Sequence, residues 1–350
     1  MKNKIIILTL IFLFAGSIVM GLTLINLTPD EAYESAAENN IQFEVDELNL
    51  ELMQIAYEKT LKSASILALN NYSGQLVKYY NPYISETNLI AKEMENTRSR
   101  KQLEIDIIST SISLESALLA YDEADTSYSQ AATSYNEALA DPTVSSSDEL
   151  SLKYAMESLK ISLHQAQNNM ESAQHRLDDI VGQDGVSVLL PVEYSSPYVI
   201  EQDKVYESAL ETNIGIFKSK RSAMAAEIKF DIAEKYYDND EEIYISALAG
   251  FKNAELAYDK SLVSLEMNVL DDINNLKNKF DSIALAELYK KIKLDEYNAA
   301  KSQFNAGILS ENQFDSAEDT YITSQKQLES KIHDYILASM RFTMDYGYDF

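Results

Sequence analysis

The sequence predicts an all-α protein built from two tandem copies of long antiparallel coiled-coil helical hairpins, with little or no β structure. Three observations lead to this prediction: an internal duplication, a helical repeat of apolar residues, and a shortage of helix-breaking residues. The 350 residues contain only 9 Gly and 5 Pro, as expected of long uninterrupted helices.

The duplication can be read directly from the residues. Residues 32–41 (AYESAAENNI) reappear as residues 205–214 (VYESALETNI), with seven identities at a shift of 173 positions. A second correspondence places residues 136–182 over residues 301–347 at a shift of 165. Because copies of about 165 residues are too long for solenoid repeats, we expect a duplicated domain. The predicted boundaries are 28–184 for the first copy, 185–199 for a linker and 200–350 for the second copy.

Residues 1–27 form a separate segment. Lys2 and Lys4 precede an apolar run over residues 5–15, the arrangement of a secretory signal peptide, and cleavage could follow Gly21. The apolar stretch continues for about 23 residues, which is long enough to span a bilayer, so an uncleaved membrane anchor is the alternative. Either reading places the rest of the chain outside the cytoplasm, in the cell envelope and associated with a membrane.

The first helix of the first copy has a well-defined start. Thr28 is expected at the N-cap, Pro29 at the first helical position, and Glu31 reaches back to complete a capping box. Pro82 separates this helix from a second one. Residues 95–139 as one helix would be about 65–70 Å long at 1.5 Å per residue.

A short turn is expected in each long hairpin, at Pro142 in the first copy and at Gly307 in the second. Such short connections join antiparallel helices. Gly307 can adopt the left-handed conformation that ends a helix, whereas Pro142 requires a different turn. Ser145 and Ser310 restart the following helices as capping boxes. The second helices carry apolar residues at alternating steps of three and four, the pattern of left-handed coiled coils: Met156, Leu159, Leu163, Ala166, Met170, Ala173, Leu177 and Ile180 in the first copy.

Several of these residues resemble a known family. Residues 27–32 (LTPDEA), residues 38–40 (ENN) and residues 304–310 (FNAGILS) are similar to the corresponding parts of TolC-like outer membrane efflux proteins. The internal duplication is also a feature of that family. The resemblance implies three protomers that form a hollow helical tunnel, as a TolC-like α-barrel. It also implies docking onto a periplasmic adaptor (membrane fusion) protein and an inner-membrane pump, with a β-barrel at the far end.

The chain departs from the family at the place where membrane strands are inserted. Residues 72–83 and residues 236–244 are the matching intervals in the two copies. A transmembrane strand needs about 9–11 residues of alternating pattern, so neither interval can supply two strands. We therefore expect the β-barrel strands to be absent.

The hairpin turns are the candidate functional sites. The resemblance implies that the turn of the second copy meets the adaptor, with Asp141 to Val144 replacing it in the first copy. Acidic residues just beyond each turn are candidates for the lining of the tunnel entrance. The residues are Ala306, Gly307, Ile308 and Leu309, then Asp141, Pro142, Thr143 and Val144, and finally the acids Asp148 and Asp315.

No catalytic or cofactor-binding arrangement is visible, so we expect neither an enzyme nor a cofactor. His164, His175 and His333 are expected on exposed helix surfaces, and no metal site is expected. Residues 238–242 (DNDEE) lack the glycine and the glutamate spacing of a calcium loop. The net charge of −27 repels nucleic acid. The chain has no Cys, which excludes disulfides and thiolate metal sites and is compatible with export.

The sequence thus predicts a homotrimeric export component that passes substrates from a pump and adaptor. An acidic lining of such a conduit would favour cations over anions. The alternative is an anchored or exported coiled-coil scaffold without transport activity. A helical pore-forming toxin would need an apolar insertion segment, and none occurs after residue 27.

Overall fold

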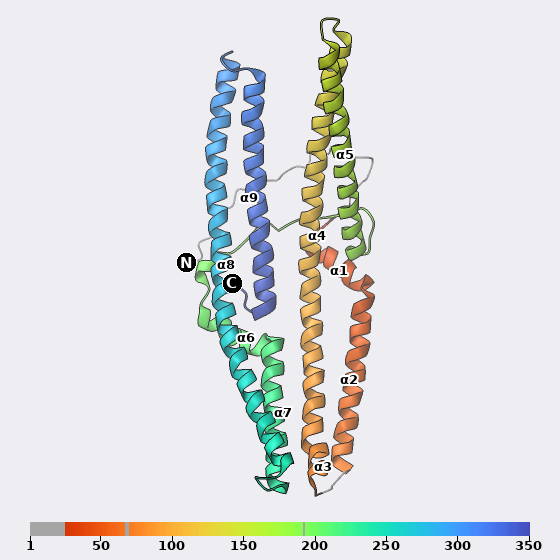
Figure 1. The fold of residues 1–350 in the computed structure, drawn as a ribbon, viewed down its shortest axis with the longest axis vertical. Coiled ribbons are helices and arrows are strands. Elements are labelled where there is room, and N and C mark those ends of the chain that lie inside the picture. Colours follow the sequence, from red (N-terminus) through yellow and green to blue (C-terminus); the bar gives the residue numbers. More distant parts are fainter. Residues whose placement is uncertain (1–24, 67–69, 192) are drawn as a thin grey trace. The chain divides into compact units, whose positions relative to one another are not determined.

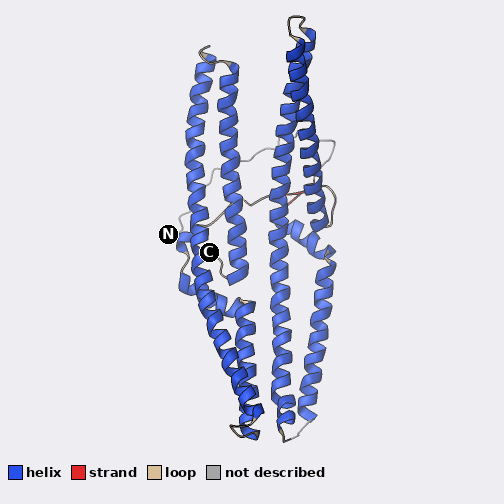
Figure 2. Cartoon of the chain, viewed as in Figure 1, coloured by secondary structure: helices blue, strands red, loops and turns tan. Residues whose placement is uncertain are grey.

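The computed structural model describes residues 25–66, 70–191 and 193–350. Nearly all of these residues are helical, and the two strands among them have three residues each (Figure 2). The predicted all-α fold is therefore confirmed. Residues 1–24, which make up most of the predicted signal peptide or anchor, lie outside the described residues. Among the helices that are described, none combines the length and the apolar character needed to cross a membrane.

One of two compact units contains the chain up to Asn40 together with Leu103–Glu193. Its strands β1 (Ile25–Leu27) and β2 (Val186–Val188) pair in parallel, with Ile25 opposite Val186. Its helices are α1 (Pro29–Asn39), the second part of α4 (Asn81–Ala140) and α5 (Ser146–Val181). The strand pair fixes the start of the folded chain beside the end of α5.

The other unit contains Ile41–Gln102 and Tyr194–Phe350. Its first elements are α2 (Ile41–Ile66), α3 (Tyr72–Gln75), the π-helical turn η1 (Leu76–Tyr80) and the start of α4. The later elements are the 3₁₀ turn η2 (Pro197–Val199), α6 (Gln202–Thr212), α7 (Ile214–Tyr236), α8 (Glu242–Asn305) and α9 (Glu311–Tyr346). The compact units therefore differ from the two copies read from the sequence, and the division into copies stays a prediction.

The same local packing occurs in both units, at positions that the sequence repeat relates. In the first unit, Ala32 and Ala36 of α1 are buried, and the Ser35 hydroxyl donates to the Val181 carbonyl at 2.9 Å. In the second unit Val205 and Ala209 of α6 are buried in the same way. The Ser208 hydroxyl, 173 positions after Ser35, donates to the Gly347 carbonyl at 3.1 Å. Each short helix therefore packs against the C-terminal end of a long one.

Two glycines make this close approach possible. Gly182 ends α5 with φ of 74°, and Gly347 ends α9 with φ of 64°. A Cβ atom at Gly182 would lie 2.7 Å from the Asn39 side chain, and one at Gly347 would lie 2.6 Å from the Thr212 side chain. Each position requires glycine for two reasons. The left-handed backbone disfavours a side chain, and the neighbouring helix leaves no space for one.

Ion pairs join α4 to its neighbours in the second unit. Lys92 of α4 contacts Asp46 of α2 at 2.7 Å, and Lys218 of α7 contacts Glu95 of α4 at 2.6 Å. Arg221 of α7 also pairs with Glu86 and lies over the Tyr83 ring. These contacts place α4 between α2 and α7, and α7 in turn packs along α8.

The intervals in which membrane strands were considered contain none. Residues 72–80 form α3 and η1, and residues 237–241 connect α7 to α8 without strand structure. The two intervals meet at one end of the second unit, which we call the lower end (bottom of Figure 1). There the Tyr236 hydroxyl donates to Asn70 at 3.0 Å, and the rings of Tyr72 and Tyr237 meet edge to face at 5.2 Å. The prediction that these intervals hold no strands is confirmed.

A hydrophobic core in the second unit lies among α6, α8 and α9. Tyr335 is fully buried in it and donates its hydroxyl to the Ser195 carbonyl at 2.6 Å. Burial raises the pKa of Tyr335 to about 12. Tyr346, also buried, donates to Asp272 at 2.6 Å, and burial together with this carboxylate raises its pKa as well. Both tyrosines therefore stay neutral and act as packing residues with one satisfied hydroxyl.

Candidate functional site: the two hairpin tips

The tip of the second hairpin joins α8 to α9 through residues 306–310 (Figure 1). Gly307 has φ of 71°, as the sequence predicts. Its N–H donates to the Phe304 carbonyl at 2.9 Å, and the N–H of Ile308 donates to the Gln303 carbonyl at 2.9 Å. These two bonds form a Schellman motif, which satisfies the last carbonyls of α8.

The surface of this tip is apolar and open. Ile308 is 72% exposed, and a Cβ atom at Gly307 would meet nothing within 4 Å. Ala306 and Leu309 flank these residues in the same turn, so all four predicted tip residues lie together. Glycine is therefore needed at position 307 for its backbone conformation and leaves room for a partner to approach.

Aromatic rings support the second tip from below. Phe304 of α8 stacks on Phe314 of α9 with ring centroids 5.0 Å apart, and Tyr297 stacks on Tyr321 at 5.6 Å. Tyr297 also contacts Phe314 at 5.7 Å. Such pairs add to the energy of area burial. They hold α8 and α9 together up to the last turn, so the tip is presented on a rigid base.

The tip of the first hairpin is built from polar contacts. One carboxylate oxygen of Asp141 accepts from the Thr143 N–H at 2.8 Å and from the Thr143 hydroxyl at 2.7 Å. These bonds, first the one from the side chain and then the one from the backbone, lower the pKa of Asp141. Pro142 and Val144 complete the turn, in which the Val144 N–H donates to the Asp141 carbonyl at 3.2 Å. The predicted difference between the two turns is thus present, and the first tip offers a polar surface.

The two predicted entrance acids lie in the first turns of α5 and α9. Asp148 is exposed and is a capping residue: its N–H donates to the Ser145 hydroxyl at 3.2 Å, and its carboxylate accepts from that hydroxyl at 2.7 Å. Gln313 has the corresponding role in α9, where it accepts from the Ser310 N–H at 3.1 Å. Asp315 is exposed on α9. The two acids belong to different units, and a role in lining an entrance stays a prediction.

One histidine differs from its expected environment. His164 and His175 are exposed, as predicted, whereas His333 is buried. The reason is its helix face: Ile336, which is also buried, lies three residues further along α9. Burial lowers the pKa of His333, which favours the neutral ring.

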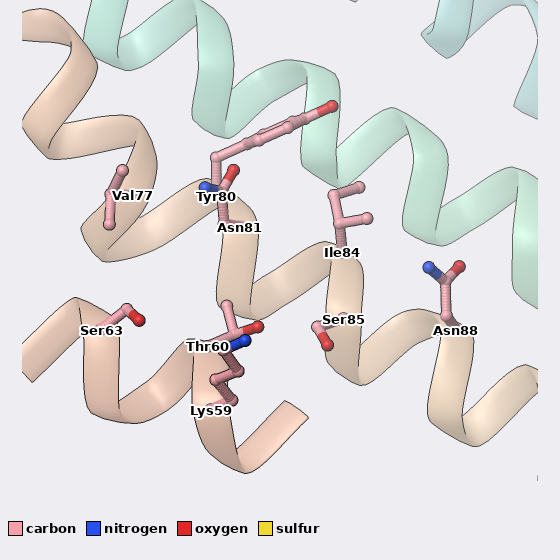
Figure 3. Close-up of a pocket in the computed structure, with 9 residues that line it drawn as sticks. All are labelled: Lys59, Thr60, Ser63, Val77, Tyr80, Asn81, Ile84, Ser85 and Asn88. Atoms are coloured by element: carbon pink, nitrogen blue, oxygen red, sulfur yellow. The ribbon is translucent and has the colours of Figure 1, made fainter. Parts of the chain in front are cut away.

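A groove of mixed polar and apolar lining, between α2, η1 and the start of α4, was not anticipated from the sequence. Figure 3 shows the lining side chains, which come from α2 (Lys59, Thr60 and Ser63), from η1 (Val77 and Tyr80) and from α4 (Asn81, Ile84, Ser85 and Asn88). The small side chains of Thr60, Ser63 and Ser85 leave space that larger ones would fill. The sequence signal is these small residues on both helices, and it becomes visible only once the two helices are known to be neighbours.

Comparison with solved structures shows which proteins have a similar architecture. The chain is similar to the CmeC outer membrane channel of Campylobacter jejuni, with 12% identity, a TM-score of 0.63 and coverage of 91% of this chain and 85% of that chain. It is also similar to the outer membrane protein VceC of Vibrio cholerae, with 13% identity, a TM-score of 0.62 and coverage of 92% of this chain and 97% of that chain. The MtrE outer membrane channel of Neisseria gonorrhoeae matches with 12% identity, a TM-score of 0.59 and coverage of 91% of this chain and 89% of that chain.

No protein-family model matches the chain, and no curated protein does either. The structural similarity nevertheless extends over about nine-tenths of the chain. It agrees with the resemblance carried by residues 27–40 and 304–310. The chain therefore has the fold of the TolC-like outer membrane channels.

Proposed function

We propose that this chain is a non-enzymatic component of an export or efflux system in the cell envelope. Several copies, three by analogy with the family, form a helical conduit. The conduit receives substrates from an inner-membrane pump through an adaptor of the periplasmic (membrane fusion) type. The observation that carries the proposal is the fold itself, which matches outer membrane proteins and channels over nearly the whole chain at 12–13% sequence identity.

The construction of the hairpins supports the proposal. A conduit needs walls that keep their shape, and α4 and α8 supply single helices of 60 and 64 residues. At 1.5 Å per residue these helices are about 90–95 Å long. In α8 the buried residues Leu265, Val269, Ile273 and Leu276 recur at steps of four and three, as in helices that pack along their length.

The second tip is the proposed contact with the adaptor. Its exposed Ile308 and the open space at Gly307 suit an apolar helical partner that approaches the backbone closely. In the first turn the exposed residues are Asp141, Pro142 and Thr143, and Asp141 accepts both Thr143 hydrogen bonds, so the turn itself presents a polar pair where the second tip presents Ile308. We infer that the two tips bind an adaptor unequally and that the second tip provides most of the affinity.

The charge of the chain suits some cargoes better than others. A net charge of −27 per copy gives an assembly of several copies a strongly negative potential. Such a potential concentrates cations and repels anions. We therefore propose that cationic or neutral compounds pass through the conduit more readily than anionic ones.

A deletion strain tests this function. We expect loss of the gene to lower the inhibitory concentration of at least one compound in a panel of toxic cations and neutral drugs. Wild-type protein should restore resistance, and an Ile308→Asp variant should not. Thr143→Asp, which also adds a carboxylate but at the first tip, is the matched control and should restore resistance. Unchanged resistance across the whole panel after deletion would favour a scaffold without transport activity.

A further inference from the structure

The groove between α2, η1 and the start of α4 has the size of a ligand site (Figure 3). Its volume is about 440 Å³, and small-molecule sites commonly measure about 300–1,000 Å³. All of its lining residues belong to the second unit. Val77 and Tyr80 come from η1, the one π-helical segment among the residues that the structure describes. Because π-helical turns within helices occur frequently at functional sites, we examined the groove for a ligand.

Several polar side chains of the groove are left unused by the fold. In the described part of the chain, the side chains of Ser63, Ser85 and Asn88 make no hydrogen bond to another residue. Serine and threonine in a helix can instead donate to the carbonyl four residues earlier. Thr60 does so in the same groove, where its hydroxyl donates to the Ala56 carbonyl at 2.8 Å. The unused groups are therefore available to a ligand.

The groove also has a local positive charge. Among the described residues that line it, Lys59 is the only charged one, although the chain has 56 Asp and Glu. The acids next to lining residues in the sequence have other partners: Glu58 accepts from Gln54 at 3.1 Å, and Glu86 pairs with Arg221. Screening at physiological salt acts over about 8 Å, so a ligand in the groove interacts with Lys59 more strongly than with distant acids.

These groups together define the chemistry of a ligand. Hydroxyl and amide groups both donate and accept hydrogen bonds, so they match a molecule with several hydroxyl groups. Val77, Ile84 and the ring of Tyr80 supply apolar surface against which the C–H face of a sugar ring can pack. The ammonium of Lys59 matches a carboxylate. A sugar that carries a carboxylate offers all three features.

We propose that this groove binds an acidic sugar. Lys59 pairs with the carboxylate, Ser63, Ser85 and Asn88 form hydrogen bonds with the hydroxyl groups, and Tyr80 packs on the ring. The proposal goes beyond the export function and does not depend on it, because the whole groove lies within one copy of the chain. Since η1 is at the lower end of the second unit, the site would hold that end to a carbohydrate of the cell envelope.

Titration of the purified full chain with two matched sugars tests the charge. The probes are N-acetylmuramic acid and N-acetylglucosamine, which has the same ring without the carboxylate, and ligand-observed NMR measures binding. We expect saturable binding in the millimolar range, about two- to fivefold tighter for the acid, as one exposed ion pair contributes. Lys59→Gln should remove this difference. Lys62→Gln, at an exposed lysine of α2 outside the groove, is the matched control and should keep it.

Filling the groove tests its position. Ser85→Leu narrows it from α4 and Ser63→Leu narrows it from α2, and each should abolish binding of both sugars. Ser65→Leu, on α2 but outside the groove, should bind like the wild type. Circular dichroism checks that each variant keeps the helical content of the wild type.

Three results would overturn the proposal. Wild-type protein that binds neither sugar saturably at millimolar concentration would show that the groove is no sugar site. Equal affinity for the two sugars would remove the role of Lys59. Binding that survives in both folded leucine variants would place the sugar elsewhere on the molecule. None of these results bears on the conduit, which is tested by resistance in the deletion strain.

Discussion

Replacing Gly347 with alanine tests the contact between α6 and the end of α9. Gly347 has φ of 64°, and an added Cβ atom would lie 2.6 Å from Thr212 Cγ2 and 2.8 Å from Thr212 Oγ1. Gly307→Ala is the matched control. That glycine has a similar φ of 71°, but nothing lies within 4 Å of its Cβ position.

Both substitutions place an alanine in a left-handed backbone, and only Gly347→Ala also overpacks a neighbouring side chain. A left-handed backbone costs an alanine roughly 1–2 kcal/mol. Overpacking against Thr212 adds about 1–3 kcal/mol, because both neighbouring helices must shift. The free energy of unfolding should therefore fall by about 2–5 kcal/mol for Gly347→Ala and by about 1–2 kcal/mol for Gly307→Ala.

Urea unfolding followed by circular dichroism measures this difference. With a slope of about 3 kcal/mol per molar urea, the midpoint should fall by about 0.7–1.7 M for Gly347→Ala and by about 0.3–0.7 M for Gly307→Ala. Gly182→Ala should behave like Gly347→Ala, since its Cβ atom would lie 2.7 Å from Asn39. Equal midpoints for the variants at positions 347 and 307 would refute the close packing of α6 on α9.

Two further predictions concern pH. Tyr335→Phe leaves the Ser195 carbonyl without its donor and should cost about 1–3 kcal/mol. The pKa of Tyr335 is raised from 10 to about 12, so this contribution is complete below pH 10 and disappears between pH 10 and 12. The difference in melting temperature between wild type and variant should shrink over that range, and a constant difference would contradict it. The pKa of Asp141 is lowered by Thr143, so stabilisation of the first tip is present above its ordinary pKa and lost as pH falls below it. The Thr143 amide should lose its protection against hydrogen exchange, measured relative to the intrinsic rate at the same pH, as Asp141 is protonated in acid, and at neutral pH in Asp141→Ala. Protection that changes with neither would contradict the turn.

Much of the helical framework follows from local residue chemistry. Thr28 and Glu31 form the predicted capping box, with the Thr28 N–H donating to Glu31 at 2.8 Å. Gly307 takes its predicted left-handed conformation. These two features depend on residues within one helical turn, so the sequence alone is sufficient. The predicted separation at Pro82 is wrong: helical backbone runs from α3 through η1 into α4, and the new helix begins earlier, at Tyr72 after the N-cap Asn71. Pro82 is tolerated because it lies in a π-to-α junction rather than in a regular α-helix.

The contacts between distant segments were not predicted. The pairing of β1 with β2 joins residues about 160 positions apart, and three-residue strands carry too little pattern to be recognised. The packing of α4 against α7 depends on pairs such as Lys218 with Glu95, which any two charged helices could offer. The second compact unit therefore combines segments from both copies, a result that depends on tertiary packing rather than on local preference.

At the tips, too, the local backbone conformation could be predicted from the sequence, whereas exposure and contacts could not. The left-handed glycine of the second tip was identified from its spacing to Ser310. In contrast, the exposure of Ile308 and the mutual satisfaction of Asp141 and Thr143 needed the folded turns. Similarly, the sequence of α2 has apolar residues on two faces, one with Phe43 and one with Leu48 and Leu52. Only the structure shows which face is already covered.

Electron microscopy of the purified full chain tests the central claim most directly, because it images the assembly without requiring a known substrate or partner. The conduit predicts particles that are rings with a central hole when viewed end-on and long parallel-sided tubes when viewed from the side. Single hairpin-shaped rods, or closed bundles without a central hole, would contradict it.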